Sequence, residues 1–457
     1  TEPTNGEYSR TLMLQYLQIL DQQTANTPLA ADAYWQGKQL HPLAMGALAA
    51  DKVGNTTARD QFLSRIRTIL TNWYTYTAGE PDYFFYYNPD WGTTYYRVSE
   101  FGANTGITDH HFTYGYYVFA SAVLASYDAN FRTQYGGMVE HLLRDYANPS
   151  RTDTLYPFFR NFDPYEGHSW AGGYADNNNG NNQEAAGESL FGWVGEYLWG
   201  VVTGNTAWRN AGIYGFTTEL KAVEQYWFNY DGDNWVPQWT HKTVGQVYGT
   251  SNFYGTFFSG APVHIYGIHW LPTSEYLTSY GFNASKVGAL YNGFVKDNGG
   301  PETDWRHVVW PIQSLSDAPS AISKWNVANV QQNEAFNTYW FIHNLSSLGQ
   351  RTTDIWATGS AATRRSRCPA RWTPCSPRSP SSSRPSATSS ACRWAFPAWW
   401  WKASRKPPPT CTRTGPTMTW AAPCTNSPGA RCAPITPGST RRCARATRPI
   451  SSPRRTW

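Results

Sequence analysis

The first 360 residues of this 457-residue chain contain no cysteine, because all seven cysteines lie between Cys368 and Cys443. A disulfide framework, a zinc–thiolate site and an iron–sulfur cluster are therefore excluded from this part of the chain. It also lacks any apolar run of the roughly 18 residues that a membrane span requires. We therefore expect no membrane partner and a core held by packing alone, which a chain of this length can supply.

The last 97 residues lack acidic side chains altogether, although they carry 18 lysines and arginines. The first 360 residues hold the other 19 basic groups and all 32 acidic groups, a net charge of −13. A surface of that sign repels phosphate. We therefore exclude nucleic acid as the partner of the main part of the chain.

Residues 359–457 are rich in Arg, Pro, Ser and Cys and show no apolar period of a helix or a strand. Two interpretations fit this composition: a basic tail that binds nucleic acid or a membrane, and a gene read out of frame after about residue 360. Seven tryptophans, three of them consecutive at residues 399–401, are unusual for a basic tail. We therefore favour the out-of-frame interpretation and expect an unfolded tail after a domain at 1–358.

Aromatic side chains are abundant where cysteine is absent, since 66 of the first 360 residues are Phe, Trp or Tyr. That share is roughly twice the level of an ordinary globular protein. A tryptophan or tyrosine ring combines a flat apolar face with a polar edge, and a sugar ring has the same pairing of surfaces. Composition alone therefore allows two interpretations, a carbohydrate ligand and a large aromatic core.

Helical apolar spacing recurs along the first 350 residues, between loops rich in Gly, Asn and aromatic residues. For example, Tyr116, Phe119, Ala120, Val123 and Tyr127 follow the spacing of one helix face. Ten to twelve helices of this kind predict a mainly α chain. We expect an (α/α)6 barrel with long aromatic- and Gly-rich loops, and a helical solenoid is the alternative. The expected helices span residues 8–21, 42–52, 59–76, 116–127, 138–146, 183–202, 208–228, 274–280, 286–296 and 334–348.

Glu184 and Glu188 lie near the start of the expected helix at 183–202, directly after an Asn- and Gly-rich loop. On one helix, their spacing of four puts both carboxylates on one face, with Cβ atoms roughly 5–6 Å apart. Mutual repulsion would raise the pKa of one of them, as general acid–base catalysis needs. The alternative is that both residues favour the helix start through the macrodipole and face solvent.

Two further segments combine titratable and aromatic side chains. In residues 108–117, Asp109 is a candidate acid, and His110 and His111 are candidates to position it or to bind a metal. Adjacent histidines point in different directions in regular structure and no third ligand stands at metal-site spacing, so we expect no metal. In residues 163–173, His168 and Trp170 stand beside glycines, as an aromatic sugar platform requires, although a lone histidine is often structural.

Three motifs in order carry a resemblance to a known family: "DHHFTYGYY" at residues 109–117, "RNFDPYEGHSWAGG" at 160–173 and "NNQEAAGE" at 181–188. Together they are similar to the catalytic core of glycoside hydrolase family 81, the endo-1,3-β-glucanases. Supporting matches are "YWQGKQL" at 34–40, "NPDWG" at 88–92 and "YGIHWLP" at 266–272, so that the resemblance spans roughly residues 30–350. Thr113 stands where the family commonly has a histidine.

The resemblance implies an (α/α)6 barrel that hydrolyses β-1,3-glucan with inversion and needs no cofactor. It implies a preceding β-sandwich, for which we find no counterpart, so we expect a catalytic domain shortened at its N-terminus. Asp109 occupies the position of the general acid, Glu184 that of the general base, and Glu188 that of the glutamate that assists or orients the water. An inverting pair stands about 6.5–9.5 Å apart to admit that water. We expect glucose units to be held by His110, His111, Tyr114, Tyr116, His168 and Trp170, with Trp91 and Trp270 as additional candidates.

Three functions stay open at this point. The first is an inverting endo-1,3-β-glucanase, which we expect to be a monomer and, because its polymeric substrate lies outside cells, to be secreted. The second is a catalytically inactive fragment that binds β-glucan. The third is another α/α-barrel enzyme, such as a β-1,4-glucanase or a polysaccharide lyase.

Overall fold

The computed structural model describes residues 2–3, 7–175, 178–282 and 284–344, and the expected tail at 359–457 lies outside them. In this part of the chain, twelve α-helices alternate with loops and short strands. The helices are α1 (Arg10–Thr24), α2 (Ala33–Lys52), α3 (Thr56–Trp73), α4 (His110–Tyr127), α5 (Ala129–Ala147), α6 (Ala186–Thr203), α7 (Thr206–Ala222), α8 (Pro262–Gly267), α9 (Ala284–Asn298), α10 (Arg306–Ser314), α11 (Ala318–Ser323) and α12 (Ala335–Asn344).

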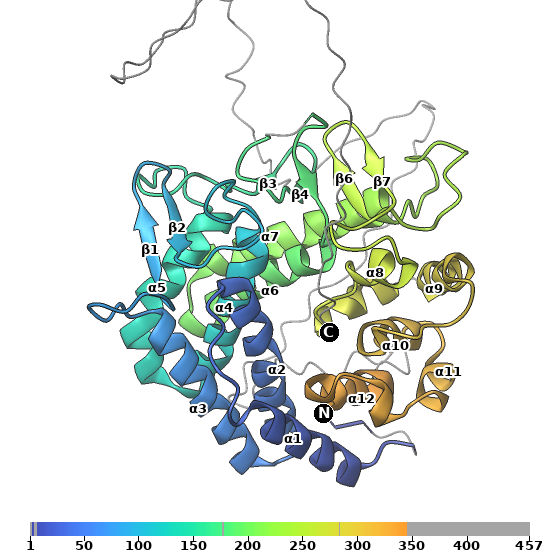
Figure 1. Cartoon of the computed structure of the whole chain (residues 1–457), viewed down its shortest axis with the longest axis horizontal. Coiled ribbons are helices and arrows are strands. Elements are labelled where there is room, and N and C mark those ends of the chain that lie inside the picture. Colours follow the sequence, from blue (N-terminus) through green and yellow to red (C-terminus); the bar gives the residue numbers. More distant parts are fainter. Residues whose placement is uncertain (1, 4–6, 176–177, 283, 345–457) are drawn as a thin grey trace, which may run out of the picture. The chain divides into compact units, whose positions relative to one another are not determined.

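The even-numbered helices form an inner ring, and the odd-numbered helices pack around it (Figure 1). Helix α2 packs against α4, α4 against α6, α8 against α10, α10 against α12, and α12 returns to α2. A 3₁₀ helix, η2 (Glu275–Phe282), packs against the inner helix α6 and the outer helix α9. This arrangement is the expected (α/α)6 barrel. The return of α12 to α1 and α2 excludes the open solenoid.

Inner and outer helices differ in how they are buried. The outer helix α3 buries one stripe, formed by Phe62, Ile66, Leu70 and Trp73, which recur every three or four residues. The inner helix α4 is buried at every position from residue 110 to 125. An amphipathic period is therefore clear in the outer helices, whereas an inner helix, surrounded by protein, has little polar face to show.

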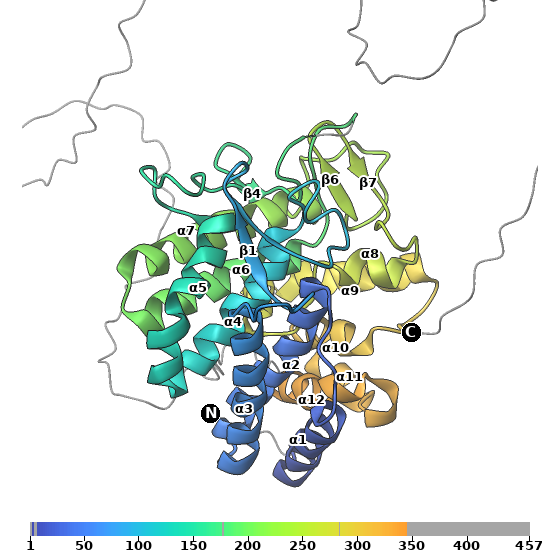
Figure 2. The same cartoon turned by 60° about the vertical axis from the view of Figure 1, so that its left-hand side comes forward.

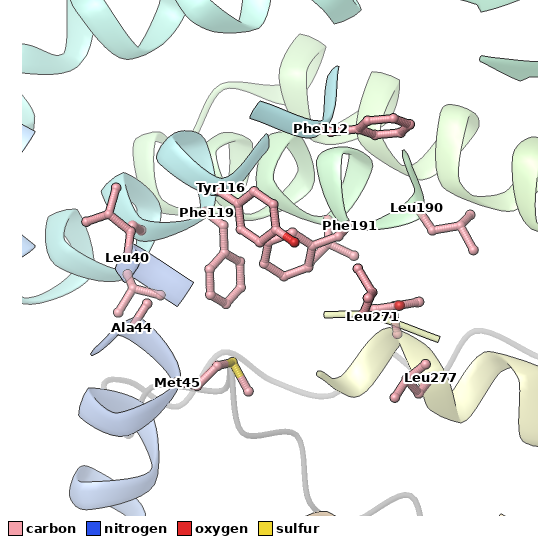
Figure 3. Close-up of a cluster of buried hydrophobic side chains, with 14 of the residues drawn as sticks. Leu40, Ala44, Met45, Phe112, Tyr116, Phe119, Leu190, Phe191, Leu271 and Leu277 are labelled. Atoms are coloured by element: carbon pink, nitrogen blue, oxygen red, sulfur yellow. The ribbon is translucent and has the colours of Figure 1, made fainter. Parts of the chain in front are cut away.

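Small residues let the inner helices approach closely. A Cβ atom added to Gly115 of α4 would lie 2.8 Å from the Cα of Gly192 in α6, closer than real Cβ contacts allow. Beside this contact, the ring of Phe191 packs 5.3 Å from that of Tyr116 and 4.6 Å from that of Phe119, measured between centroids. Figure 3 shows these three side chains pointing toward one another from α4 and α6.

Seven short strands connect the helices in the described part of the chain, and all lie on one side of the ring (Figures 1 and 2). The strands β2 and β5 precede the inner helices α4 and α6 in the sequence, so this side of the ring holds the N-terminal ends of both helices. The seven strands pair as two antiparallel hairpins, β1–β2 and β3–β4, and as an antiparallel sheet in the order β5–β6–β7. Their bounds are β1 (Phe85–Asn88), β2 (Thr93–Tyr96), β3 (Phe162–Asp163), β4 (His168–Ser169), β5 (Asn182–Gln183), β6 (Gln246–Tyr248) and β7 (Asn252–Phe253).

Several helix boundaries differ from the sequence-based expectations. Helix α2 starts at residue 33 and continues through Pro42, which the prediction had taken as its first residue. The predicted helix 208–228 changes into a π-helix, η1 (Val223–Trp227), and the predicted helix 274–280 is the 3₁₀ helix η2. Helices α8, α10 and α11 were missed because each has nine residues or fewer and contains a proline. Two further 3₁₀ turns are η3 (Val327–Asn329) and η4 (Gln332–Glu334).

No helix in the described ranges has both the length and the apolar character needed to cross a bilayer.

Candidate active site

Three carboxylates gather where α4 and α6 begin. Asp109 directly precedes α4, Glu184 lies between β5 and α6, and Glu188 is in the first turn of α6. The charges of both glutamates act on Asp109 and raise its pKa, so the structure brings the three predicted catalytic side chains within electrostatic range of one another. They come from two different segments of the chain, so the fold, and not the spacing along one helix, sets the gap between Asp109 and the glutamates.

The prediction that Glu184 and Glu188 share one face of a helix is wrong. Helix α6 begins only at residue 186, because Gln183 pairs with Val247 in the β5–β6 ladder and holds the preceding chain extended. Ala185 is the N-cap residue, with φ −78° and ψ 76°. Glu184 therefore stands before the helix, and its carboxylate is positioned by the sheet.

Asp109 has a left-handed backbone conformation, with φ 62°, which Asp and Asn adopt more readily than most residues. Its N–H donates to the carbonyl oxygen of Ala171 at 2.9 Å, which fixes the turn into α4. The partly exposed side chain makes no capping hydrogen bond to the helix. Burial, followed by the charges of Glu184 and Glu188, raises the pKa of Asp109 well above its usual range. Burial and the neighbouring charges thus favour the protonated form of Asp109, the form that can donate a proton.

Glu184 is held by two donors from the segment around β6 and β7. Its Oε1 atom accepts a hydrogen bond from the backbone N–H of Phe257 at 2.7 Å and one from Nε2 of Gln246 at 3.4 Å. Burial raises the pKa of Glu184 to about 7, and the charge of Glu188 adds to the rise while the two donors oppose it. Glu184 therefore changes its protonation state near neutral pH, as a general base does.

Glu188 is buried and paired with a lysine. Its Oε1 atom accepts hydrogen bonds from Lys38 Nζ at 2.7 Å, from the Tyr116 hydroxyl at 2.7 Å and from the Tyr34 hydroxyl at 3.1 Å. Lys38 also donates to the Tyr116 oxygen at 2.9 Å. The Glu188 side chain is 3 % exposed and that of Lys38 27 %. The ion pair compensates the buried charge of Glu188 and fixes one of its two oxygens.

Lys38 and Tyr34 were missed as site residues, although both lie in the motif "YWQGKQL". Helix α2 starts at residue 33, so its first two turns project both side chains toward Glu188, about 150 residues later in the chain. No spacing pattern in the sequence indicates that the motif at 34–40 lies beside Glu188.

Removing the lysine should destabilise the fold measurably. We expect Lys38→Met to lower the free energy of unfolding by about 2 kcal/mol, because it leaves the buried Glu188 carboxylate without its counter-charge. The double variant Lys38→Met/Glu188→Gln should recover most of that loss, since no unpaired charge remains. Urea denaturation of the three variants and the parent chain measures this coupling. Equal losses in the single and the double variant would contradict the pairing.

His110 is a structural residue. Its ring is fully buried, with Nδ1 2.7 Å from Asp145 Oδ1 and Nε2 2.9 Å from the carbonyl oxygen of Ala103. Both ring nitrogens therefore have protein partners, and the predicted contact of His110 with sugar is not supported. The ring ties the first residue of α4, next to Asp109, to helix α5.

Three other predicted sugar-binding side chains are also core residues. Tyr114 donates its hydroxyl proton to the carbonyl oxygen of Thr94, His168 contacts the carbonyl oxygen of Ser169, and Trp270 packs against Tyr266 and Phe294. All three rings are buried, so the structure shows no exposed ring face for the predicted contact with glucose units. The motifs drew attention to these three residues, but their rings are part of the aromatic core and do not face a ligand.

The remaining predicted binding residues have mixed positions. His111 is buried beside Gln183, and burial lowers the pKa of His111 to about 3, so its ring is neutral at ordinary pH. Tyr116 is buried but reaches Glu188 with its hydroxyl. Trp170 is partly exposed and donates from Nε1 to Asp163, and Trp91 is 61 % exposed. Of the predicted aromatic platforms, Trp91 and Trp170 retain exposed ring surface.

Among the described residues, no group of three or more His, Cys, Asp or Glu side chains is placed to hold a metal ion.

Comparisons with known proteins agree with this geometry. Residues 9–342 match the family described as "Glycosyl hydrolase family 81 C-terminal domain". A glucan endo-1,3-beta-D-glucosidase of Acetivibrio thermocellus is 37 % identical over 352 residues, which cover 76 % of this chain and 45 % of that protein. A glucan endo-1,3-beta-D-glucosidase of Thermobifida fusca is 33 % identical over 335 residues, which cover 72 % of this chain and 44 % of that protein.

A solved structure shows the same fold. The structure of a mutant glycoside hydrolase family 81 protein from Clostridium thermocellum superimposes on this chain with a TM-score of 0.72 at 35 % sequence identity. The superposition covers 76 % of this chain and 48 % of the other chain. The chain thus spans about half the length of the relatives it matches. The family match runs from α1 into α12 and includes all three carboxylates, and so the chain belongs to glycosyl hydrolase family 81.

Proposed function

We propose that this chain hydrolyses internal bonds of β-1,3-glucan with inversion of the anomeric centre. The observation that carries the proposal is the gathering of Asp109, Glu184 and Glu188, from two segments of the chain, where α4 and α6 begin. The pKa of Asp109 is raised by burial and by the charges of both glutamates, while the pKa of Glu184 is raised to about 7 by burial and by Glu188. Burial and the neighbouring charges thus favour the protonated form of Asp109, which an acid needs, while Glu184 is ionised above pH 7, as a base needs.

Each carboxylate then has a defined role. Asp109 donates its proton to the glycosidic oxygen as the bond from that oxygen to the anomeric carbon breaks. A water molecule attacks the same carbon from the opposite face of the ring and gives one proton to Glu184. Glu188, with one oxygen held by Lys38, Tyr34 and Tyr116, is placed to orient that water.

The test uses the 457-residue chain with laminarin and curdlan. We expect new reducing ends, and the first product seen by ¹H NMR should be the α-anomer. An initial β-anomer would overturn inversion, an unsaturated product absorbing in the ultraviolet would indicate a lyase, and preference for a β-1,4-glucan would indicate a cellulase. The chain spans only about half of its relatives, and this favours one second candidate, a fragment that binds β-glucan without turnover. Binding without any product would support it.

The pH dependence follows from the same pKa values. Because Glu184 must be ionised and its pKa is about 7, we expect kcat/KM to rise with pH and to reach half its maximum near pH 7. Removing the neighbouring charge in Glu188→Gln should move this midpoint to lower pH, since Glu188 raises the pKa of Glu184. Initial rates on laminarin between pH 4 and 9 measure both midpoints. A midpoint that does not move in Glu188→Gln would contradict the coupling.

We further propose that the protein acts outside cells, because its polymeric substrate is found there, and that it acts as a monomer. Sedimentation of the purified chain and immunodetection in culture medium test the two statements separately.

A further inference from the structure

A tight turn at residues 256–259 presents two phenylalanines to solvent. The Thr256 N–H donates to the carbonyl oxygen of Ser259, and the Ser259 N–H donates to the Thr256 hydroxyl oxygen at 2.8 Å. The Thr256 hydroxyl in turn donates to the Ser259 carbonyl oxygen at 2.9 Å. Phe257 and Phe258, between these residues, are 66 % and 57 % exposed. The turn is therefore fixed by its own hydrogen bonds, while two large apolar rings at its tip remain in water.

The turn is continuous with the candidate active site. The N–H of Phe257 donates to Glu184 Oε1 at 2.7 Å, and its Cβ atom is only two bonds from that nitrogen. The ring of Phe257 therefore starts beside the candidate base. An exposed aromatic side chain on the residue whose N–H holds the candidate base is well placed to meet the molecule on which the base acts.

The second ring belongs to an aromatic cluster with a polar edge. Phe258 lies 5.4 Å from the ring of His264 and 6.1 Å from that of Trp305, and His264 and Trp305 are 4.6 Å apart, measured between centroids. His264 Nδ1 lies 2.7 Å from the Ser259 hydroxyl oxygen, and its Nε2 lies 3.5 Å from the exposed carboxylate of Asp304. Flat apolar ring faces thus lie next to hydrogen-bonding groups. A pyranose ring has the complementary surfaces, an apolar face and a polar edge.

We propose that Phe257 and Phe258 form a binding subsite that stacks on glucose rings of the glucan chain next to Glu184. The proposal rests on the proposed function for its substrate class and adds a site that is absent from the sequence-based prediction. A protein partner would also cover exposed phenylalanines. The direct hydrogen bond from Phe257 to Glu184 favours the substrate, because it places the patch beside the candidate catalytic carboxylates.

Binding is measured without turnover, in the Asp109→Asn background, with laminarin as the probe in isothermal titration calorimetry. We expect Phe257→Ala to weaken laminarin binding about tenfold, because one buried phenyl face is lost from the complex. Phe257→Trp should restore most of the affinity, since it keeps a flat aromatic face. Ile213→Ala is the matched control: Ile213 is 46 % exposed on the outer helix α7, and its removal should leave the affinity unchanged.

Each outcome has a distinct meaning. Unchanged affinity in Phe257→Ala and in Phe258→Ala, with normal laminarin hydrolysis by the parent chain, overturns the subsite and leaves the proposed function standing. Variants that change the sedimentation coefficient but not the laminarin affinity would assign the patch to a protein partner and overturn the subsite as well. A parent chain that neither binds nor cleaves laminarin overturns the proposed function and the subsite together.

Discussion

Under the proposed function, replacing Asp109 with Asn should lower kcat on laminarin about 10³-fold, because the amide cannot deliver a proton to the leaving oxygen. The fold should be unaffected, for two reasons. The Asp109 side chain makes no capping hydrogen bond to α4, and Asn also adopts the left-handed conformation found there, with φ 62°. Steady-state rates and thermal unfolding of the variant and the parent chain measure the two effects.

The choice of substrate separates loss of the acid from a general loss of activity. An aryl β-laminarioligosaccharide whose phenol is a good leaving group needs little protonation, so Asp109→Asn should cleave it with a much smaller defect than laminarin. An equal defect on both substrates would contradict the role of proton donor. Full activity on laminarin would remove Asp109 from the mechanism.

Replacing Glu184 with Gln should also lower kcat about 10³-fold, and on both substrates, because water activation is needed whatever the leaving group. Azide needs no deprotonation, so it should restore turnover of the aryl substrate and give the α-glycosyl azide. A β-azide would indicate a different geometry of attack. Gln keeps the size of the side chain and can still accept the hydrogen bond from Phe257.

The same variant should be more stable than the parent chain at high pH. The pKa of Glu184 is about 7 in the folded chain, against an ordinary value of 4.5. The folded state therefore holds this proton more tightly than the unfolded state does, and stability is lost as the pH rises from 4.5 through 7. Above that range, Glu184→Gln avoids the loss and should gain up to about 3 kcal/mol in free energy of unfolding. Denaturant unfolding at pH 5 and pH 8 tests this difference, and an equal effect at both values would contradict it.

Apolar periodicity predicted the ring of helices, because the outer helices show a clear amphipathic face, as the stripe from Phe62 to Trp73 illustrates. Periodicity did not predict the helix boundaries that depend on tertiary contacts. The start of α6 depends on the pairing of Gln183 with Val247, about 60 residues later, which no local pattern contains. Pro42 was taken as a helix boundary by the general rule, yet it lies inside α2.

The three candidate catalytic carboxylates could be identified from motifs, whereas their surroundings could not. Lys38 and Phe257 touch Glu188 and Glu184, and each lies more than 70 residues away in the chain. Aromatic residues were the least predictable, because composition does not separate a ring for the core from a ring for a ligand. Trp270 is buried, while Phe257, which no motif included, is exposed.

The closure of the ring has a consequence for chain connectivity. The Tyr339 hydroxyl of α12 accepts a hydrogen bond from the Ser9 N–H at 2.7 Å, and the ring of Tyr8 stacks on that of Tyr339 at 5.7 Å. The first and last described helices are thus neighbours (Figure 1). A circular permutant, with a short linker between these helices and new ends in the exposed turn at residues 151–155, should therefore assemble the same barrel from a reordered polypeptide.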